Sequence, residues 1–134
     1  MPVHRGSSAL VCVSHSPIIM IRARPPREEQ ALLAYYERCP WQIETFAPER
    51  VIIFGTDHFA GFHLSLMPAY CIGLECSAVA DVGGFPGRLD VPRDDAMRLA
   101  QGLRAADFDM AVSYRMKVDH GFSQPLKRLL GAHD

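Results

Sequence analysis

Two short apolar runs, each followed by a histidine-bearing turn, constrain the fold of this chain more than any other feature. Leu10–Val13 leads directly to Ser14 and His15, and Val51–Phe54 precedes His58 by a few residues. Both runs contain β-branched residues and are too short for a typical helix. This pattern indicates strands covered on both faces, as in a parallel sheet. We therefore expect two buried strands, of which Val51–Phe54 is the stronger prediction.

The segment between these runs has the periodicity of a helix. Apolar residues recur at three- and four-residue spacing, which places them on one face. Pro40 lies inside the pattern and predicts a kink or two short helices, and Pro48 marks the end. The apolar positions are Leu32, Tyr36, Cys39, Ile43 and Phe46.

The rest of the chain repeats the alternation of strand and helix. Residues 59–91 are rich in Gly and Pro and suggest turns around one or two short strands. Asp94 is a candidate cap for a helix, and Phe108–Tyr114 reads as a third buried strand. A last helix is expected to start near Ser123 and to end at Gly131.

These elements predict an α/β fold, with a mainly parallel or mixed sheet flanked by helices, in one domain over residues 1–134. Three strands make a thin sheet, whose uncovered edge would expose unpaired backbone groups. We therefore expect a sheet that is incomplete within this sequence.

The composition limits the classes of partner. Hydrophobic residues make up 49% and charged residues 22%, and the formal net charge of -1 excludes the basic footprint of a protein that binds nucleic acid or an anionic membrane. No apolar stretch reaches the length of a membrane span or a signal-peptide core, so we expect a cytoplasmic protein. The four cysteines match no zinc-ribbon spacing and are expected to be reduced and mostly buried.

Three histidines follow predicted strands and are the candidate chemistry. His15 and His58 come after the first two strands, and His120 lies six residues beyond Tyr114. Ligands of open α/β sheets bind outside the carboxyl ends of the strands, so the three imidazoles are candidates for one shared site. The alternative is that each is a hydrogen-bonded turn residue.

Two of these histidines are preceded by an aspartate, Asp57 and Asp119. A carboxylate near a metal site commonly orients an imidazole. Because neighbouring side chains diverge, each aspartate would serve a histidine other than the one it adjoins, or would simply cap a turn. Both readings stay open at this point.

Several ordered motifs resemble the class III extradiol ring-cleavage dioxygenases, and specifically the 2,3-dihydroxyphenylpropionate 1,2-dioxygenase branch of that family. The resemblance covers nearly all 134 residues, while the family continues well past the last of them. The motifs that carry it are Ser14-His15-Ser16-Pro17, Asp57-His58-Phe59-Ala60-Gly61-Phe62, Met67-Pro68, Ala111-Val112-Ser113-Tyr114 and Val118-Asp119-His120-Gly121-Phe122-Ser123-Gln124-Pro125-Leu126.

The resemblance implies a role for each matching residue. His15 and His58 would be ligands of a ferrous ion, Fe(2+), His120 would be the acid/base residue near the substrate, and Asp119 would support His120. In the family, a glutamate ligand and a second catalytic histidine come from the C-terminal half, and neither has a counterpart in this sequence. The implied substrates are O2 and a catechol such as 3-(2,3-dihydroxyphenyl)propionate.

Three functional hypotheses follow. The first is an extradiol dioxygenase of aromatic-compound catabolism whose other half comes from a longer chain or a second polypeptide. The second is a truncated, non-catalytic α/β domain or subunit that lacks the third iron ligand. The third is a zinc-dependent hydrolase, for which no water-activating carboxylate is evident. Under the first two we expect association, either as a homo-oligomer or with a C-terminal half.

Overall fold

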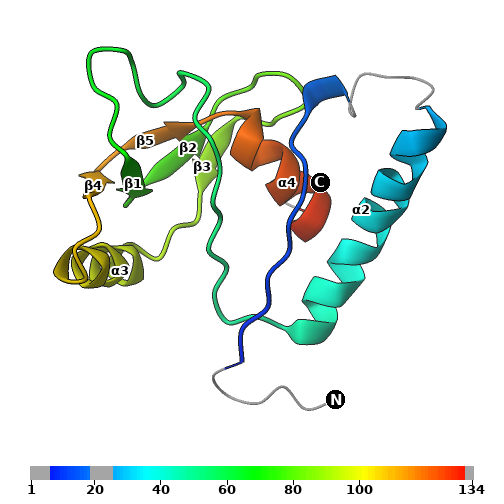
Figure 1. The fold of residues 1–134 in the computed structure, drawn as a ribbon, viewed down its shortest axis with the longest axis horizontal. Coiled ribbons are helices and arrows are strands. Elements are labelled where there is room, and N and C mark those ends of the chain that lie inside the picture. The colour runs from blue at the N-terminus through cyan, green and yellow to red at the C-terminus, as the bar shows by residue number, and fades with distance from the viewer. Residues whose placement is uncertain (1–6, 19–25, 132–134) are drawn as a thin grey trace.

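The computed structural model describes residues 7–18 and 26–131, and within them three helices and five short strands form a mixed α/β fold (Figure 1). Figure 1 shows α4 between the strands and the long helix α2. The elements in chain order are α2 (Arg27–Phe46), β1 (Tyr70–Gly73), β2 (Cys76–Ala78), β3 (Gly87–Leu89), α3 (Arg93–Ala105), β4 (Met110–Ser113), β5 (Met116–Val118) and α4 (His120–Leu130).

The strands form two small open sheets, and the parallel strand pairs in both have the same register. β1 pairs with β4 in parallel, while β2 lies between antiparallel β3 and parallel β5. Gly73 is opposite Ser113 and Cys76 is opposite Met116, so both parallel pairs keep an offset of 40 residues. The pairing of β2 with β5 therefore continues that of β1 with β4, after an interruption of two residues in each chain segment. The expected mixed, mainly parallel sheet is confirmed, but it is built from different residues.

The core is small and lies where α4 covers the second sheet. Ala78 of β2, Val118 of β5 and Phe85 are buried together, and Phe122 and Leu126 of α4 pack against them. On the other side, α4 contacts α2, where the guanidinium of Arg128 lies 5.0 Å from the ring centre of Tyr36. This helix thus joins the sheet to α2 and fixes the position of its own first residue, His120.

The two apolar runs are not strands, and this prediction was wrong. Residues 10–13 and 51–54 belong to neither a helix nor a sheet, and Figure 1 draws both as irregular chain. Leu10 is 85% exposed, Ile52 61% and Phe54 90%. A strand of this kind needs neighbours that pair with its backbone, and no described residue pairs with either segment in a sheet.

The third predicted strand is confirmed as β4, and residues 59–91 hold three short strands instead of one or two. α2 runs through Pro40 as one helix, contrary to the expected kink or break. Proline removes one intrahelical hydrogen bond, and the burial of Tyr36 and Cys39 stabilises the turn that precedes it.

The ends of the other two helices differ in detail from the prediction. Asp94 lies in the first turn of α3, and Pro92 occupies the cap position. α4 begins at His120, three residues before Ser123, because the Asp119 carboxylate caps it. Gly131 ends α4 in the left-handed conformation, as predicted.

The cysteines are all free thiols, but only Cys39 is buried; Cys71 and Cys76 are half-buried and Cys12 is exposed. Burial raises the pKa of the Cys71 and Cys76 thiols, which favours their protonated form. None of the helices in the described ranges is long and apolar enough to cross a membrane.

Candidate metal and acid–base site

Three histidine rings from distant parts of the chain meet beside the start of α4. The ring centres of His58 and His120 are 4.6 Å apart and nearly parallel, with 16° between the planes. His15 lies 5.1 Å from His58 and 6.0 Å from His120. The structure thus brings together the three histidines of the predicted shared site, although His15 and His58 follow irregular segments and not strands.

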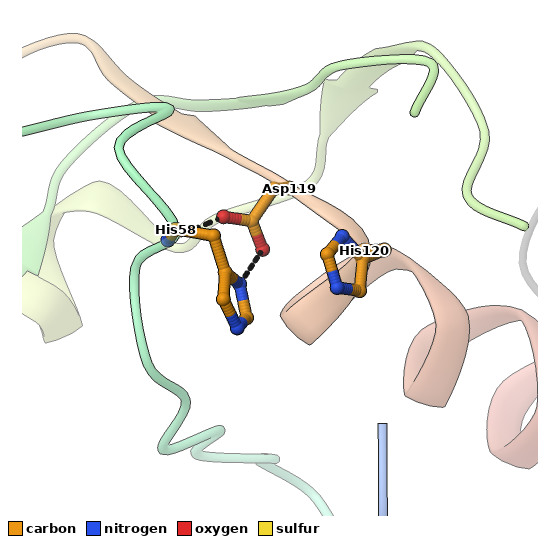
Figure 2. Close-up of side chains that lie close together, drawn as sticks. All are labelled: His58, Asp119 and His120. Carbon is orange, nitrogen blue, oxygen red and sulfur yellow. Dashed lines mark hydrogen bonds and ion pairs between the residues drawn. The ribbon is translucent and has the colours of Figure 1, made fainter. Parts of the chain in front are cut away.

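Asp119 is the buried centre of this cluster (Figure 2). One of its oxygens accepts hydrogen bonds from His58 Nδ1, at 3.1 Å, and from the Gly121 backbone N–H, at 2.8 Å. The other oxygen accepts from the His58 backbone N–H at 2.7 Å. A single carboxylate therefore caps α4 and fixes both the backbone and the ring of His58.

Asp119 is suited to stay ionised in this position. Burial opposes its ionisation, but hydrogen bonds from the ring and backbone of His58 and from the backbone of Gly121 outweigh burial and lower the pKa of Asp119. An ionised acceptor keeps the proton of His58 on Nδ1. In the neutral ring, Nε2 is then the nitrogen without a proton, on a side chain that is 40% exposed, and it can bind a cation.

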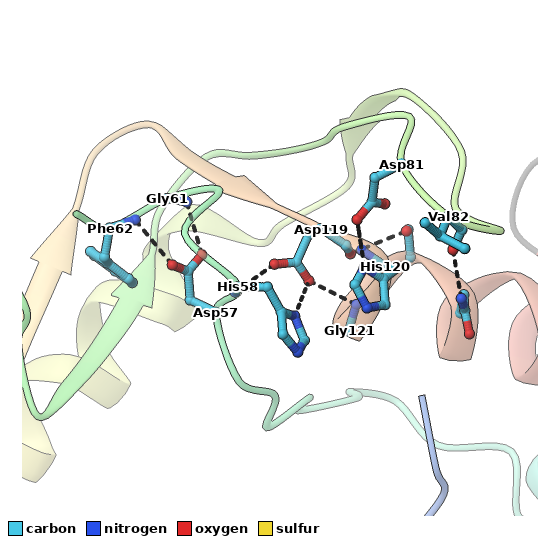
Figure 3. Close-up of polar contacts among 11 residues, drawn as sticks. Asp57, His58, Gly61, Phe62, Asp81, Val82, Asp119, His120 and Gly121 are labelled. Atoms are coloured by element: carbon cyan, nitrogen blue, oxygen red, sulfur yellow. Dashed lines mark hydrogen bonds and ion pairs between the residues drawn. The ribbon is translucent and has the colours of Figure 1, made fainter. Parts of the chain in front are cut away.

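His120 has a different carboxylate partner, Asp81 (Figure 3). Asp81 Oδ2 lies 2.5 Å from His120 Nδ1 and accepts the His120 backbone N–H at 3.1 Å. Asp119, expected to support His120, instead holds the ring of His58. The expectation that an aspartate serves a histidine other than its neighbour is met here. Asp81 itself was missed, because nothing in its local sequence points to a partner 39 residues away.

Asp57 has the turn-capping role that was left open for it. Its carboxylate accepts the backbone N–H groups of Gly61, at 2.8 Å, and Phe62, at 3.2 Å. A Cβ on Gly61 would lie 2.6 Å from the carbonyl oxygen of Lys117, so only glycine fits this approach. Asp57 therefore shapes the loop after His58 and makes no hydrogen bond to a histidine ring within residues 7–18 and 26–131.

The donor set fits a divalent transition metal such as ferrous iron, for which neutral imidazoles with carboxylate partners are common ligands. The closest group of potential ligand atoms is His58, Asp119 and His120, all within 4.8 Å of one another. Asp119 is buried and already accepts three hydrogen bonds, two of them at one oxygen, so it has little capacity left to bind an ion. The half-exposed His58 and the adjacent His15 are the more accessible pair.

Comparison with known proteins gives a consistent set of relatives. The family described as the catalytic LigB subunit of aromatic ring-opening dioxygenase matches residues 9–134. A 2,3-dihydroxyphenylpropionate/2,3-dihydroxicinnamic acid 1,2-dioxygenase of Pseudomonas putida is 42% identical over 127 residues, covering 93% of this chain and 40% of that protein. One from Burkholderia vietnamiensis is 42% identical over 138 residues, covering 100% of this chain and 41% of that protein. The chain therefore spans about two fifths of the length of these relatives.

Proposed function

Since this chain belongs to the family of the catalytic LigB subunit of aromatic ring-opening dioxygenases, we propose that it provides the N-terminal part of an extradiol dioxygenase. The proposed substrates are O2 and a catechol such as 3-(2,3-dihydroxyphenyl)propionate, after the names of its relatives. The observation that carries the proposal is the convergence of three imidazoles, two of them each bonded to its own carboxylate.

His15 and His58 would hold the ferrous ion. Asp119 supports this role by keeping the proton of His58 on Nδ1, so that Nε2 is available to the ion. When bound, the iron would supply adjacent positions where a catechol and O2 exchange electrons. The half-exposed edge of His58 leaves room for a substrate beside it.

His120 would move a proton at the substrate. Its ring stacks on His58, and its Nδ1 is engaged by Asp81, so Nε2 is the nitrogen left for proton exchange. In that position it can accept a proton from a catechol hydroxyl and return it later. This role does not require His120 to bind the metal.

We further propose that the remaining three fifths of the family fold, in the same or a separate polypeptide, completes the site. It would supply the carboxylate ligand and cover residues 10–13 and 51–54. Exposed apolar runs with unpaired backbone groups are typical of a surface to which another segment adds. The cytoplasmic location and self-association expected from the sequence stay predictions.

Complementation tests this function. The chain would be co-expressed with the C-terminal three fifths of the Burkholderia vietnamiensis relative, purified anaerobically and loaded with ferrous iron. On addition of 3-(2,3-dihydroxyphenyl)propionate and air, we expect oxygen uptake and a yellow ring-opened product. His15→Ala and His58→Ala should lose iron, whereas His120→Ala should keep iron and lose turnover. His63→Ala, at an exposed loop position, is the matched control.

The outcome also separates the alternatives. A folded complex that takes up neither iron nor oxygen would favour a non-catalytic α/β subunit. Metal analysis that finds zinc together with ester or amide hydrolysis would favour the hydrolase. Equal loss of iron in all three histidine variants would overturn the division between His15 and His58 as ligands and His120 as the acid/base residue.

A further inference from the structure

Asp81 lies in the loop between β2 and β3, and its carboxylate faces His120. Its Oδ2 accepts from two groups of one residue, the ring Nδ1 at 2.5 Å and the backbone N–H at 3.1 Å. Two donors that converge on one oxygen fix the ring relative to its own backbone. Figure 3 shows Asp81 above the ring of His120, beside the separate pair of Asp119 and His58.

The loop that carries Asp81 is anchored to α4 and to β5. Gln124 Nε2 donates to the Val82 carbonyl at 2.6 Å, and the Val79 N–H donates to the Val118 carbonyl at 2.9 Å. Gly84 lies close against α4, because a Cβ there would lie 2.4 Å from Ser123 Oγ. The Asp81 carboxylate is therefore held in place before any ligand arrives.

The second oxygen of Asp81 shows that fold stability alone does not explain this residue. Oδ1 is buried and has no hydrogen-bond partner among residues 7–18 and 26–131. An unpartnered buried carboxylate oxygen carries a desolvation cost that a neutral side chain would avoid. Asp119, by contrast, has both oxygens hydrogen-bonded. A cost of this kind is typical of a group retained for what it does to its neighbour.

We infer that Asp81 is the positioning residue of His120: it holds the imidazole as the Nδ1–H tautomer, with Nε2 directed to the substrate. A carboxylate only accepts hydrogen bonds, so the ring must donate from Nδ1. Loss of the carboxylate would free the ring to rotate and to exchange tautomers. The tautomer assignment stands on the contacts above, while its consequence for turnover rests on the proposed function.

The direct test is nitrogen NMR of the 134-residue chain, labelled with 15N at histidine and recorded at a pH where imidazole is neutral. Wild-type His120 should show a protonated Nδ1 and an unprotonated Nε2. Asp81→Ala removes the acceptor at Nδ1, so the neutral ring should lose its preference for the Nδ1–H form and populate the Nε2–H form. Asp57→Ala is the matched control, because the Asp57 carboxylate bonds to backbone N–H groups.

The wild-type spectrum alone can overturn the inference, even if Asp81→Ala fails to fold: a His120 ring protonated on Nε2 would contradict it. An unchanged tautomer in a folded Asp81→Ala chain would do the same. Asp81→Glu should restore the Nδ1–H form, because the carboxylate is kept.

Kinetics of the complemented enzyme provide the functional readout. Asp81→Ala should lower kcat by about 10- to 100-fold with little change in KM or iron content. Added to His120→Ala it should cost nothing more, because it acts through that ring. A further loss in the double variant, or a loss of iron, would contradict a positioning role. Failure of wild-type turnover would count against the proposed function and leave the tautomer result standing.

Discussion

Similar apolar patterns give a strand within residues 70–131 but irregular chain in the two apolar segments 10–13 and 51–54. β4, Met110–Ser113, is a short apolar run that pairs with β1 and is partly buried along its length. Val51–Phe54 is more apolar, yet it lies outside any sheet with Ile52 and Phe54 exposed. The difference is the neighbour, since β4 has β1 beside it and α3 against it. An apolar run shows that a segment needs burial, not that the partner is present.

The largest effect should come from Asp119→Ala, which removes the hydrogen bonds that join residues 70–131 to His58, four residues after the second apolar segment. It takes away the helix cap and leaves buried donors of His58 and Gly121 unpaired, so the free energy of unfolding should fall by about 2–4 kcal/mol. Urea denaturation followed by circular dichroism measures this loss. Asp57→Ala, which frees two N–H groups in a less buried loop, should cost clearly less. Equal losses would show that Asp119 has no special structural role.

The second-largest effect should be a difference in amide hydrogen-exchange rate between β4 and residues 51–54. The amides of Ala111 and Ser113 face β1 across a parallel ladder, whereas those of Ile52 and Ile53 have no ladder partner among the described residues. We expect the first pair to exchange about 10- to 100-fold more slowly. In the complemented protein the second pair should gain protection. Similar protection of both pairs in the chain alone would mean that residues 51–54 are paired after all.

Truncation of side chains should give a smaller contrast. Val118 is 3% exposed in the core, so Val118→Ala should lower the free energy of unfolding by about 1–3 kcal/mol. Ile52→Ala should change it by no more than about 0.5 kcal/mol, because its side chain is already in water. In the complemented protein Ile52→Ala should become costly. Comparable losses in the chain alone would contradict the exposure of residues 51–54.

The smallest effect on stability should come from the ion pair between Arg50, which directly precedes residues 51–54, and Asp95 of α3. Arg50 Nε donates to Asp95 Oδ2 at 2.6 Å, and Arg50, then Arg98, lower the pKa of Asp95. Because the pKa is lowered by folding, the contribution is present above the unfolded pKa and is lost as pH falls through the folded one. Carbon NMR titration should show the Asp95 pKa rising in Arg50→Gln, and less so in high salt. No change would mean that the pair does not form in solution.

Much of the helical structure could be predicted from the sequence. The spacing of Tyr36 and Cys39 indicated α2, and Gly131 marked the end of α4, because periodicity and caps are local properties. β1, β2 and β3 could not be placed, since three- and four-residue strands depend on partners far along the chain.

The histidines of the candidate site could be predicted from the sequence, but their hydrogen-bond partners could not. His15, His58 and His120 were identified by their place after apolar segments and by family motifs, and they do lie together. Which aspartate holds which histidine depends on side-chain directions over separations of 39 and 61 residues. Sequence spacing carries no information about such directions, so Asp81 emerged only from the structure.

The bond between His58 and Asp119 also has a consequence for the order of folding. It closes a long loop, whose entropy cost is met only after α4 begins to form. During synthesis His58 leaves the ribosome well before Asp119 does. We therefore expect the imidazoles to acquire their arrangement late in folding, after β1, β2 and α3 are available. A variant that slows α4 formation would delay metal uptake without altering any proposed ligand.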